Sequence, residues 1–217
     1  MRRLSVHPPI LKAPPRTSPV SQAIELSGLV GKELLAAQRA LAAVDFVHDD
    51  GDLPTIPILK NSRLRNTLGQ YVRHGFSARA IEIKPSQDGM AFTLLEEIGH
   101  FLDHQAFGTH GFDFASEDSE RFEAWRAAVY SSQPVQDLMR GVKTARGPLR
   151  SQFIEGARLR EIWGRSYSQY MAIKSGDPVL LKQFQEDQSS LFGGLFYWTQ
   201  RQFLPIMQEV EKLLLSL

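Results

Sequence analysis

The sequence predicts an α+β fold that is predominantly helical, with a small strand region in front of a central helix. Apolar residues recur at helical spacing through residues 89–107 and through most of the chain beyond residue 117. Residues 78–84, in contrast, alternate small or apolar side chains with charged ones, which is the period of a half-buried strand. A chain of 217 residues suits one domain, and we expect that domain over residues 20–217.

The N-terminal third is expected to hold an extended arm, a helix and two strands. Residues 1–19 contain five prolines and few large apolar groups, which is typical of a flexible arm. Apolar spacing from Ser21 to Val44 predicts one long helix, or a helix broken at Gly28 and Gly31. Residues 56–58 look extended, and the proline within them favours an edge strand because proline cannot donate to a sheet ladder. The strand at 78–84 completes a small sheet before the central helix.

The rest of the chain predicts almost only helices. Their expected ranges are 89–107, 117–131, 134–142, 149–174, 178–189 and 200–216. The boundary after the 149–174 helix is marked by Gly176, which suits a helix C-terminus, and by Asp177 and Pro178, which suit the N-cap and first position of the next helix.

Composition excludes several classes of partner and site. The net charge of +1, from 25 basic and 24 acidic residues, gives no one-sided basic field, so no nucleic-acid partner is expected. No apolar run approaches the roughly 20 residues that span a bilayer, so we expect a soluble protein without a membrane partner. Because the chain has no cysteine, a metal site would have to use His, Asp and Glu side chains.

The most informative feature is a stripe of ionisable side chains on the central helix. On a helical wheel, apolar side chains cover one half of residues 92–104, and the remaining arc gathers Glu96, Glu97, His100, Asp103 and His104. One interpretation is that this stripe is only the solvated face of an amphipathic helix. The other is a metal site, because residues 96–100 match the motif His-Glu-x-x-His at every position except the first ligand. In that motif two histidines one turn apart bind zinc, and the glutamate between them is a general base.

Two further segments strengthen the metal-site interpretation. The central helix contains Gly99, which costs about 1 kcal/mol relative to alanine and suits a point of close approach. Residues 94–104 resemble the metal-binding helix of phage head-morphogenesis and minor-head zincin metallopeptidases, a family related to the protease domain of anthrax lethal factor. Residues 160–170 resemble the second helix of that family, in which a glutamate binds the metal, and Glu161 takes its position. The resemblance extends over about residues 45–217.

The resemblance implies a compact, mostly helical zincin fold, a Zn²⁺ cofactor and hydrolysis of peptide bonds in a protein substrate. It assigns Glu96, His100 and Glu161 as metal ligands and Glu97 as the catalytic base. Phage structural proteins are the partners it implies, and the bacterial cytoplasm or a phage particle is the implied location. Without the family, Glu161 would be expected simply to pair with Arg165 one turn further along its helix.

Glu96 changes the expected chemistry, because the family has a histidine at this position. Two carboxylate ligands make the cation a weaker Lewis acid and favour harder ions such as Mn²⁺, Mg²⁺ or Ca²⁺. We therefore expect a weakened or inactive peptidase. The alternative is a degenerate zincin that serves as a structural or interaction module in a phage or prophage context, and an engineered change from histidine would leave the same sequence.

The other polar residues near the stripe have simpler expected roles. His104 is a second candidate ligand, in a shifted pair with His100. Asp103 is expected to orient His100 or to pin the loop that follows the helix. The remaining histidines are expected at the surface: His7, His48, His74 and His110.

Overall fold

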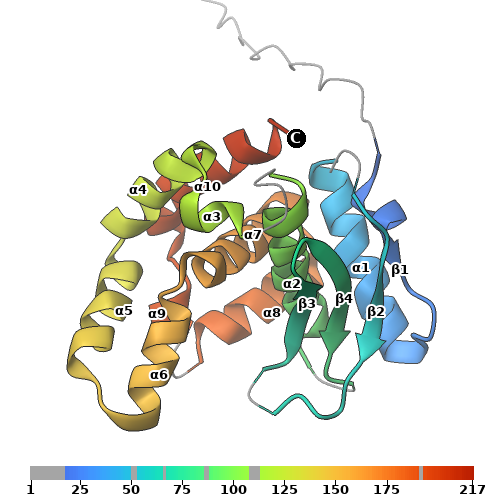
Figure 1. Ribbon diagram of the computed structural model, residues 1–217, viewed down its shortest axis with the longest axis horizontal. Helices are drawn as coiled ribbons and strands as arrows, with labels where there is room; N and C mark the ends of the chain where they lie inside the picture. The colour runs from blue at the N-terminus through green and yellow to red at the C-terminus, as the bar shows by residue number, and fades with distance from the viewer. Residues whose placement is uncertain (1–17, 50–52, 66, 86–87, 108–112, 191–192) are drawn as a thin grey trace, which may run out of the picture.

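The computed structural model describes residues 18–49, 53–65, 67–85, 88–107, 113–190 and 193–217 (Figure 1). The first half of the chain supplies a small sheet with a covering helix, and the second half is helical, as predicted. In chain order the elements of the first half are η1 (Val20–Ala23), β1 (Ile24–Glu25), α1 (Gly31–Val47), β2 (Ile56–Lys60), β3 (Gly69–His74), β4 (Ser77–Ile83) and α2 (Met90–Gln105). Residues 1–17 of the predicted arm lie outside the described ranges.

The sheet has four strands in the order β1-β2-β4-β3. The pairs β1–β2 and β2–β4 are parallel, and β3 runs antiparallel to β4, to which a tight turn at Gly75 joins it. The predicted strand at 78–84 is β4. The strands β1 and β3 were missed: β1 has two residues, and β3 lacks a clear apolar alternation.

The expectation that residues 56–58 form an edge strand was wrong, because β2 lies between β1 and β4. Pro57 is tolerated there for two reasons. It comes just before Ile58, the first residue of β2 that pairs with β4. On the other side it faces Glu25 in a ladder of only two residues, so little hydrogen bonding is lost.

The helix predicted from Ser21 to Val44 is broken at the two glycines. Gly28 and Gly31 have φ values of 89° and 58°, which favour glycine, and the chain turns there. Only the part after Gly31 is an α-helix, and it continues to Val47. Before the break the chain forms η1 and β1 instead.

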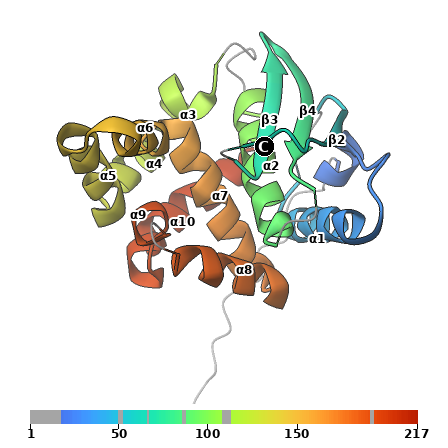
Figure 2. The ribbon, with the colours of Figure 1, turned by 90° about the horizontal axis from the view of Figure 1, so that it is seen from below.

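Helix α2 is the centre of the molecule. Figure 2 shows it between the sheet and α7, and it also packs against α1. Apolar side chains cover one face and are fully buried, as predicted: Phe92, Leu94, Leu95, Ile98, Phe101 and Leu102. The interpretation of the ionisable stripe as a solvated face was wrong, since Glu97, His100, Asp103 and His104 are all less than 9% exposed. Elements far away in the sequence cover this side of α2.

The second half holds α3 (Ala115–Asp118), η2 (Glu120–Phe122), α4 (Glu123–Ser131), α5 (Gln133–Thr144), α6 (Gly147–Gly156), α7 (Leu159–Ser175), α8 (Pro178–Gln188), α9 (Gly193–Phe196) and α10 (Gln200–Leu214). Two of the predicted helices are interrupted: extended backbone at Ser119 separates α3 from the helices after it, and extended backbone at Arg158 separates α6 from α7.

The boundary predicted between α7 and α8 is confirmed. Gly176 adopts a left-handed conformation with φ of 64° at the end of α7. The Asp177 side chain then accepts hydrogen bonds from the backbone of Val179 and Leu180 and caps α8, while Pro178 opens that helix. In the described ranges, no helix combines the length and apolar character needed to cross a membrane.

Candidate metal centre

The candidate site depends on a close approach between α2 and α7. A Cβ atom on Gly164 would lie 2.9 Å from Cε1 of His100 and 3.0 Å from Cγ of Glu96, and one on Gly99 would lie 3.0 Å from the ring of Tyr167. The two helices can therefore approach this closely only because both positions are glycine. The buried indole N–H of Trp163 donates to the carbonyl oxygen of Gly99 at 2.9 Å and fixes the register of the pair.

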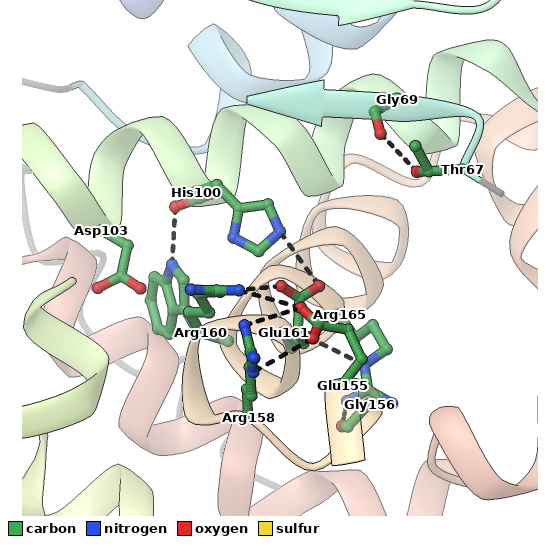
Figure 3. Close-up of polar contacts among 12 residues, drawn as sticks. Thr67, Gly69, His100, Asp103, Glu155, Gly156, Arg158, Arg160, Glu161 and Arg165 are labelled. Atoms are coloured by element: carbon green, nitrogen blue, oxygen red, sulfur yellow. Dashed lines mark hydrogen bonds and ion pairs between the residues drawn. The ribbon is translucent and has the colours of Figure 1, made fainter. Parts of the chain in front are cut away.

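Three side chains predicted as ligands meet where these helices touch. Glu96 and His100 are one turn apart on α2, and Glu161 lies in the first turn of α7. Each offers a donor atom within 4.8 Å of the other two, an arrangement that could hold a metal ion. His100 Nε2 and Glu161 Oε2 are 3.8 Å apart, and Figure 3 shows these side chains pointing toward one another. The structure thus brings together residues separated by more than 60 positions.

Two arginines that the sequence analysis did not place at the site surround Glu161. Arg160 donates from Nε to Glu161 Oε1 at 3.1 Å and also binds Glu155 (Figure 3). Arg165, only 5% exposed, does not pair with the Glu161 carboxylate. It donates instead to the backbone carbonyl oxygens of Glu161 and Gly156. The expected simple pair between Glu161 and Arg165 is therefore wrong.

Burial dominates the electrostatics of the site. It raises the pKa of Glu96 to about 7, against the nearby charge of Arg165, and the charge of Glu161 raises it further. Burial also raises the pKa of Glu97 well above its usual range, and the neighbouring Glu96 and Glu161 add to this shift. The pKa of His100 is lowered, first by burial and against the attraction of Glu161. His100 is therefore neutral near pH 7, which is the form that binds metals.

Glu97, the predicted catalytic base, faces the sheet and interacts with the charges of Glu96 and Glu161. A Cβ atom on Gly69 of β3 would be 2.9 Å from both Cγ and Oε1 of Glu97, so the edge strand lies directly against this carboxyl group. The backbone N–H of Tyr71 hydrogen-bonds the carboxylate. Since β3 was not predicted, neither contact was foreseen, although a glycine at the start of a strand is a known sign of close backbone approach.

Asp103 pins the following segment and does not orient the ligand. Its two carboxylate oxygens accept from the backbone N–H of Ser116 at 2.7 Å and from the Ser116 hydroxyl at 2.6 Å, which ties α3 to α2. Among the described residues, none hydrogen-bonds the buried Nδ1 of His100. The ring is held by packing, with Gly164 on one side and the Phe114 ring at 6.1 Å.

His104 is not part of the candidate group. It is fully buried, and its Nδ1 contacts the Tyr71 hydroxyl at 2.7 Å and the Gln105 amide at 2.8 Å. His48 was expected at the surface but is buried, with Nε2 at 2.8 Å from the hydroxyl of Tyr167. His74 is exposed as predicted, whereas His7 and His110 lie outside the described residues.

The donor set suits a divalent cation. Two carboxylates and a neutral imidazole are ordinary ligands of Zn²⁺ and Mn²⁺. A positive charge between Glu96 and Glu161 would also remove the repulsion that raises the pKa of Glu96. Finally, Gly164 leaves free the volume next to His100 and Glu96 that any larger residue would fill.

The chain matches no protein-family model, no curated protein and no solved structure. The structure shows a mixed α+β fold, with a four-stranded sheet before the helices. It also shows a candidate metal group made of Glu96, His100 and Glu161. Assignment to the zincin family remains a prediction from the motifs.

Proposed function

We propose that this protein is a zincin-type metallopeptidase whose activity is weakened by Glu96. The observation that carries the proposal is the convergence of Glu96, His100 and Glu161 within 4.8 Å. Glu97 is buried on the same helix as two of them and interacts with the charges of Glu96 and Glu161. Sequence motifs on two separate helices suggested these four residues, and packing between the same two helices brings the three candidate ligands together.

In the proposed reaction, Glu96, His100 and Glu161 would hold a divalent cation, which would supply Lewis acidity toward a water molecule and the scissile carbonyl group. Glu97 accepts a proton from the attacking water and delivers it to the leaving amine. A cation between Glu96 and Glu161 would favour the ionised form of Glu97, which can accept the proton, and the Tyr71 N–H orients its carboxylate. Burial keeps bulk water away from this proton transfer.

Glu96 weakens the reaction because it adds a negative charge at the ligand position. Arg165 and Arg160 partly offset this charge: Arg165 is the largest favourable charge acting on Glu96, and Arg160 binds Glu161 directly. A site with two carboxylates and two nearby guanidinium groups can therefore stay assembled, but its cation polarises a carbonyl group less than one held by two histidines.

A metal-binding and hydrolysis assay tests the proposal. Purified protein is dialysed against Zn²⁺ or Mn²⁺, bound metal is measured by mass spectrometry, and cleavage of a mixed peptide library is followed. We expect about one ion per chain, slow cleavage that Glu97→Gln abolishes while metal stays bound, and faster cleavage in Glu96→His. Glu186→Gln, an exposed change on α8, is the control and should match the parent protein.

A non-catalytic module is the second candidate, because Glu161 has protein partners without a cation. Arg160 occupies one oxygen of Glu161, and His100 lies near the other. Stoichiometric metal without any Glu97-dependent cleavage, even in Glu96→His, would favour this module. Absence of bound metal in both the parent protein and Glu96→His would refute the peptidase proposal.

A further inference from the structure

The turn between α5 and α6 concentrates positive charge in a chain whose net charge is only +1. Residues 139–150, which we call the α5–α6 tip, contain four basic residues, namely Arg140, Lys143, Arg146 and Arg150. No acidic residue occurs anywhere in residues 138–154. The near-neutral composition of the whole chain therefore conceals a local cationic segment.

The basic side chains of the tip are directed to solvent. All four are exposed, and within the described part of the chain Lys143 and Arg146 have no ion-pair partner. Arg140 pairs with Asp137 at 2.6 Å yet its side chain remains 66% exposed. Arg150 donates only to the carbonyl oxygen of Val142, in the other helix of the hairpin. The charge is thus available to a partner.

Large apolar side chains are exposed among these charges. Met139 is 40% exposed and Leu149 is 42% exposed. They sit next in sequence to Arg140 and Arg150, so each helix presents an apolar and a cationic side chain together. Single exposed apolar residues are common on proteins, but two within a twelve-residue stretch that also holds four exposed cations suit an interaction surface.

Helix α5 is anchored by buried residues, whereas α6 and the turn between the two helices project from the core. Figure 1 shows α5 and α6 at the lower left, with their connecting turn at the periphery and on the opposite side from the sheet. Helix α6 contains no buried residue. It is held in place by Phe153, whose ring lies directly on Gly141 of α5, and by Gly156, which faces Phe196. A helix without buried residues is not explained by core formation.

We propose that the α5–α6 tip docks on an anionic lipid surface. A projecting tip suits a flat partner, and the combination of cations with Met139 and Leu149 suits the boundary between phosphate headgroups and acyl chains. Nucleic-acid phosphates would bind the same cations but would leave Leu149 and Met139 without an apolar partner. The proposal does not depend on the metal centre, and it revises the expectation of no membrane partner, which was based on the absence of a long apolar run.

The basic residues and the exposed leucine of the tip should contribute separately to the binding constant for anionic vesicles. A basic residue near an anionic bilayer contributes about fivefold to the binding constant, so removing two of them should weaken binding about 30-fold. Burying the exposed part of one leucine contributes a further factor of about three to ten.

The experiment uses the full chain in co-sedimentation with vesicles of pure phosphatidylcholine or of phosphatidylcholine with phosphatidylglycerol. Lys143→Glu/Arg146→Glu tests the charge, and Leu149→Ser tests the apolar contact with every charge retained. Lys32→Glu/Arg201→Glu, at exposed positions on α1 and α10, is the control with the same change in net charge. We expect all variants to fold, because the substituted side chains are exposed. Circular dichroism and urea unfolding check this.

The expected result is binding to phosphatidylglycerol vesicles only, a loss of about 30-fold or more in Lys143→Glu/Arg146→Glu, a smaller loss in Leu149→Ser and little change in the control. Failure of the parent protein to bind these vesicles would overturn the proposal, as would equal binding by the tip variants. Tip-dependent binding to a short DNA duplex that is tighter than binding to vesicles would assign the surface to nucleic acid instead.

Discussion

Replacement of Gly164 by alanine tests the idea that helix packing, more than the ligands themselves, builds the metal centre. The added methyl group would lie 2.9 Å from Cε1 of His100, and 3.0 Å from both its Nε2 and Cγ of Glu96. Two of the three candidate ligands would have to move, or α7 would have to shift away from α2.

The magnitude follows from two opposing effects. Alanine is favoured over glycine inside a helix by about 1 kcal/mol, whereas an extra methyl group in a tightly packed interior costs about 1–3 kcal/mol. Gly164→Ala should therefore lower the free energy of unfolding by at most about 2 kcal/mol. Metal affinity should fall about 10- to 100-fold, the loss typical when groups that position ligands are disturbed.

Gly99→Ala is the matched control, because it crowds the same helix pair without touching a ligand. Its methyl group would meet Tyr167 at 3.0–3.1 Å. We expect a similar change in unfolding free energy, measured in urea, but a metal dissociation constant within about threefold of the parent value by titration calorimetry. Unchanged metal affinity in Gly164→Ala, or equal losses in both variants, would refute the reasoning.

Three further predictions concern the surroundings of the site. Trp163→Phe should lower the free energy of unfolding, measured in urea, by about 2–3 kcal/mol, because it removes buried volume and leaves the Gly99 carbonyl without the indole donor. A loss below about 0.5 kcal/mol would contradict a structural role for that hydrogen bond. Burial raises the pKa of Asp103 from its ordinary 3.8 to about 8, against the hydrogen bonds from Ser116. Between these two values the folded state holds a proton that the unfolded state has lost, so Asp103 makes stability fall as pH rises from 4 to 8, by up to about 1.4 kcal/mol per pH unit. In Asp103→Asn this part of the pH dependence of unfolding should disappear, and an unchanged profile would show that Asp103 is ionised in the folded protein. Zn²⁺ or Mn²⁺ at 100 times its dissociation constant should raise the free energy of unfolding of the parent protein by about 2.7 kcal/mol. A chelator should reverse this increase, and His100→Ala should not show it.

The sequence was sufficient for features that depend on local spacing. The period of the apolar residues located α2, and the Gly176-Asp177-Pro178 triplet located the boundary between α7 and α8. The spacing of Glu96 and His100 placed both on one side of α2, and the motif on the second helix indicated Glu161 as their partner.

Features that depend on distant partners could not be predicted in this way. A wheel shows which side chains share a face but not what covers that face, and for this reason the buried stripe of α2 could be interpreted as solvated. His48 is buried, and one of its hydrogen-bond partners is the hydroxyl of Tyr167, 119 residues later. Pro57 suggested an edge strand because nothing nearby in the sequence announces β1, which has only two residues.

The contacts that hold α2 against α7 have a consequence for how this protein can change in evolution. Gly99, Gly164 and Trp163 set the distance and register of the two helices, yet none of them is a candidate ligand. Because these packing residues are distinct from the candidate ligands, a substitution at position 96 leaves the contacts between α2 and α7 in place. The same framework can therefore present a different side chain at position 96.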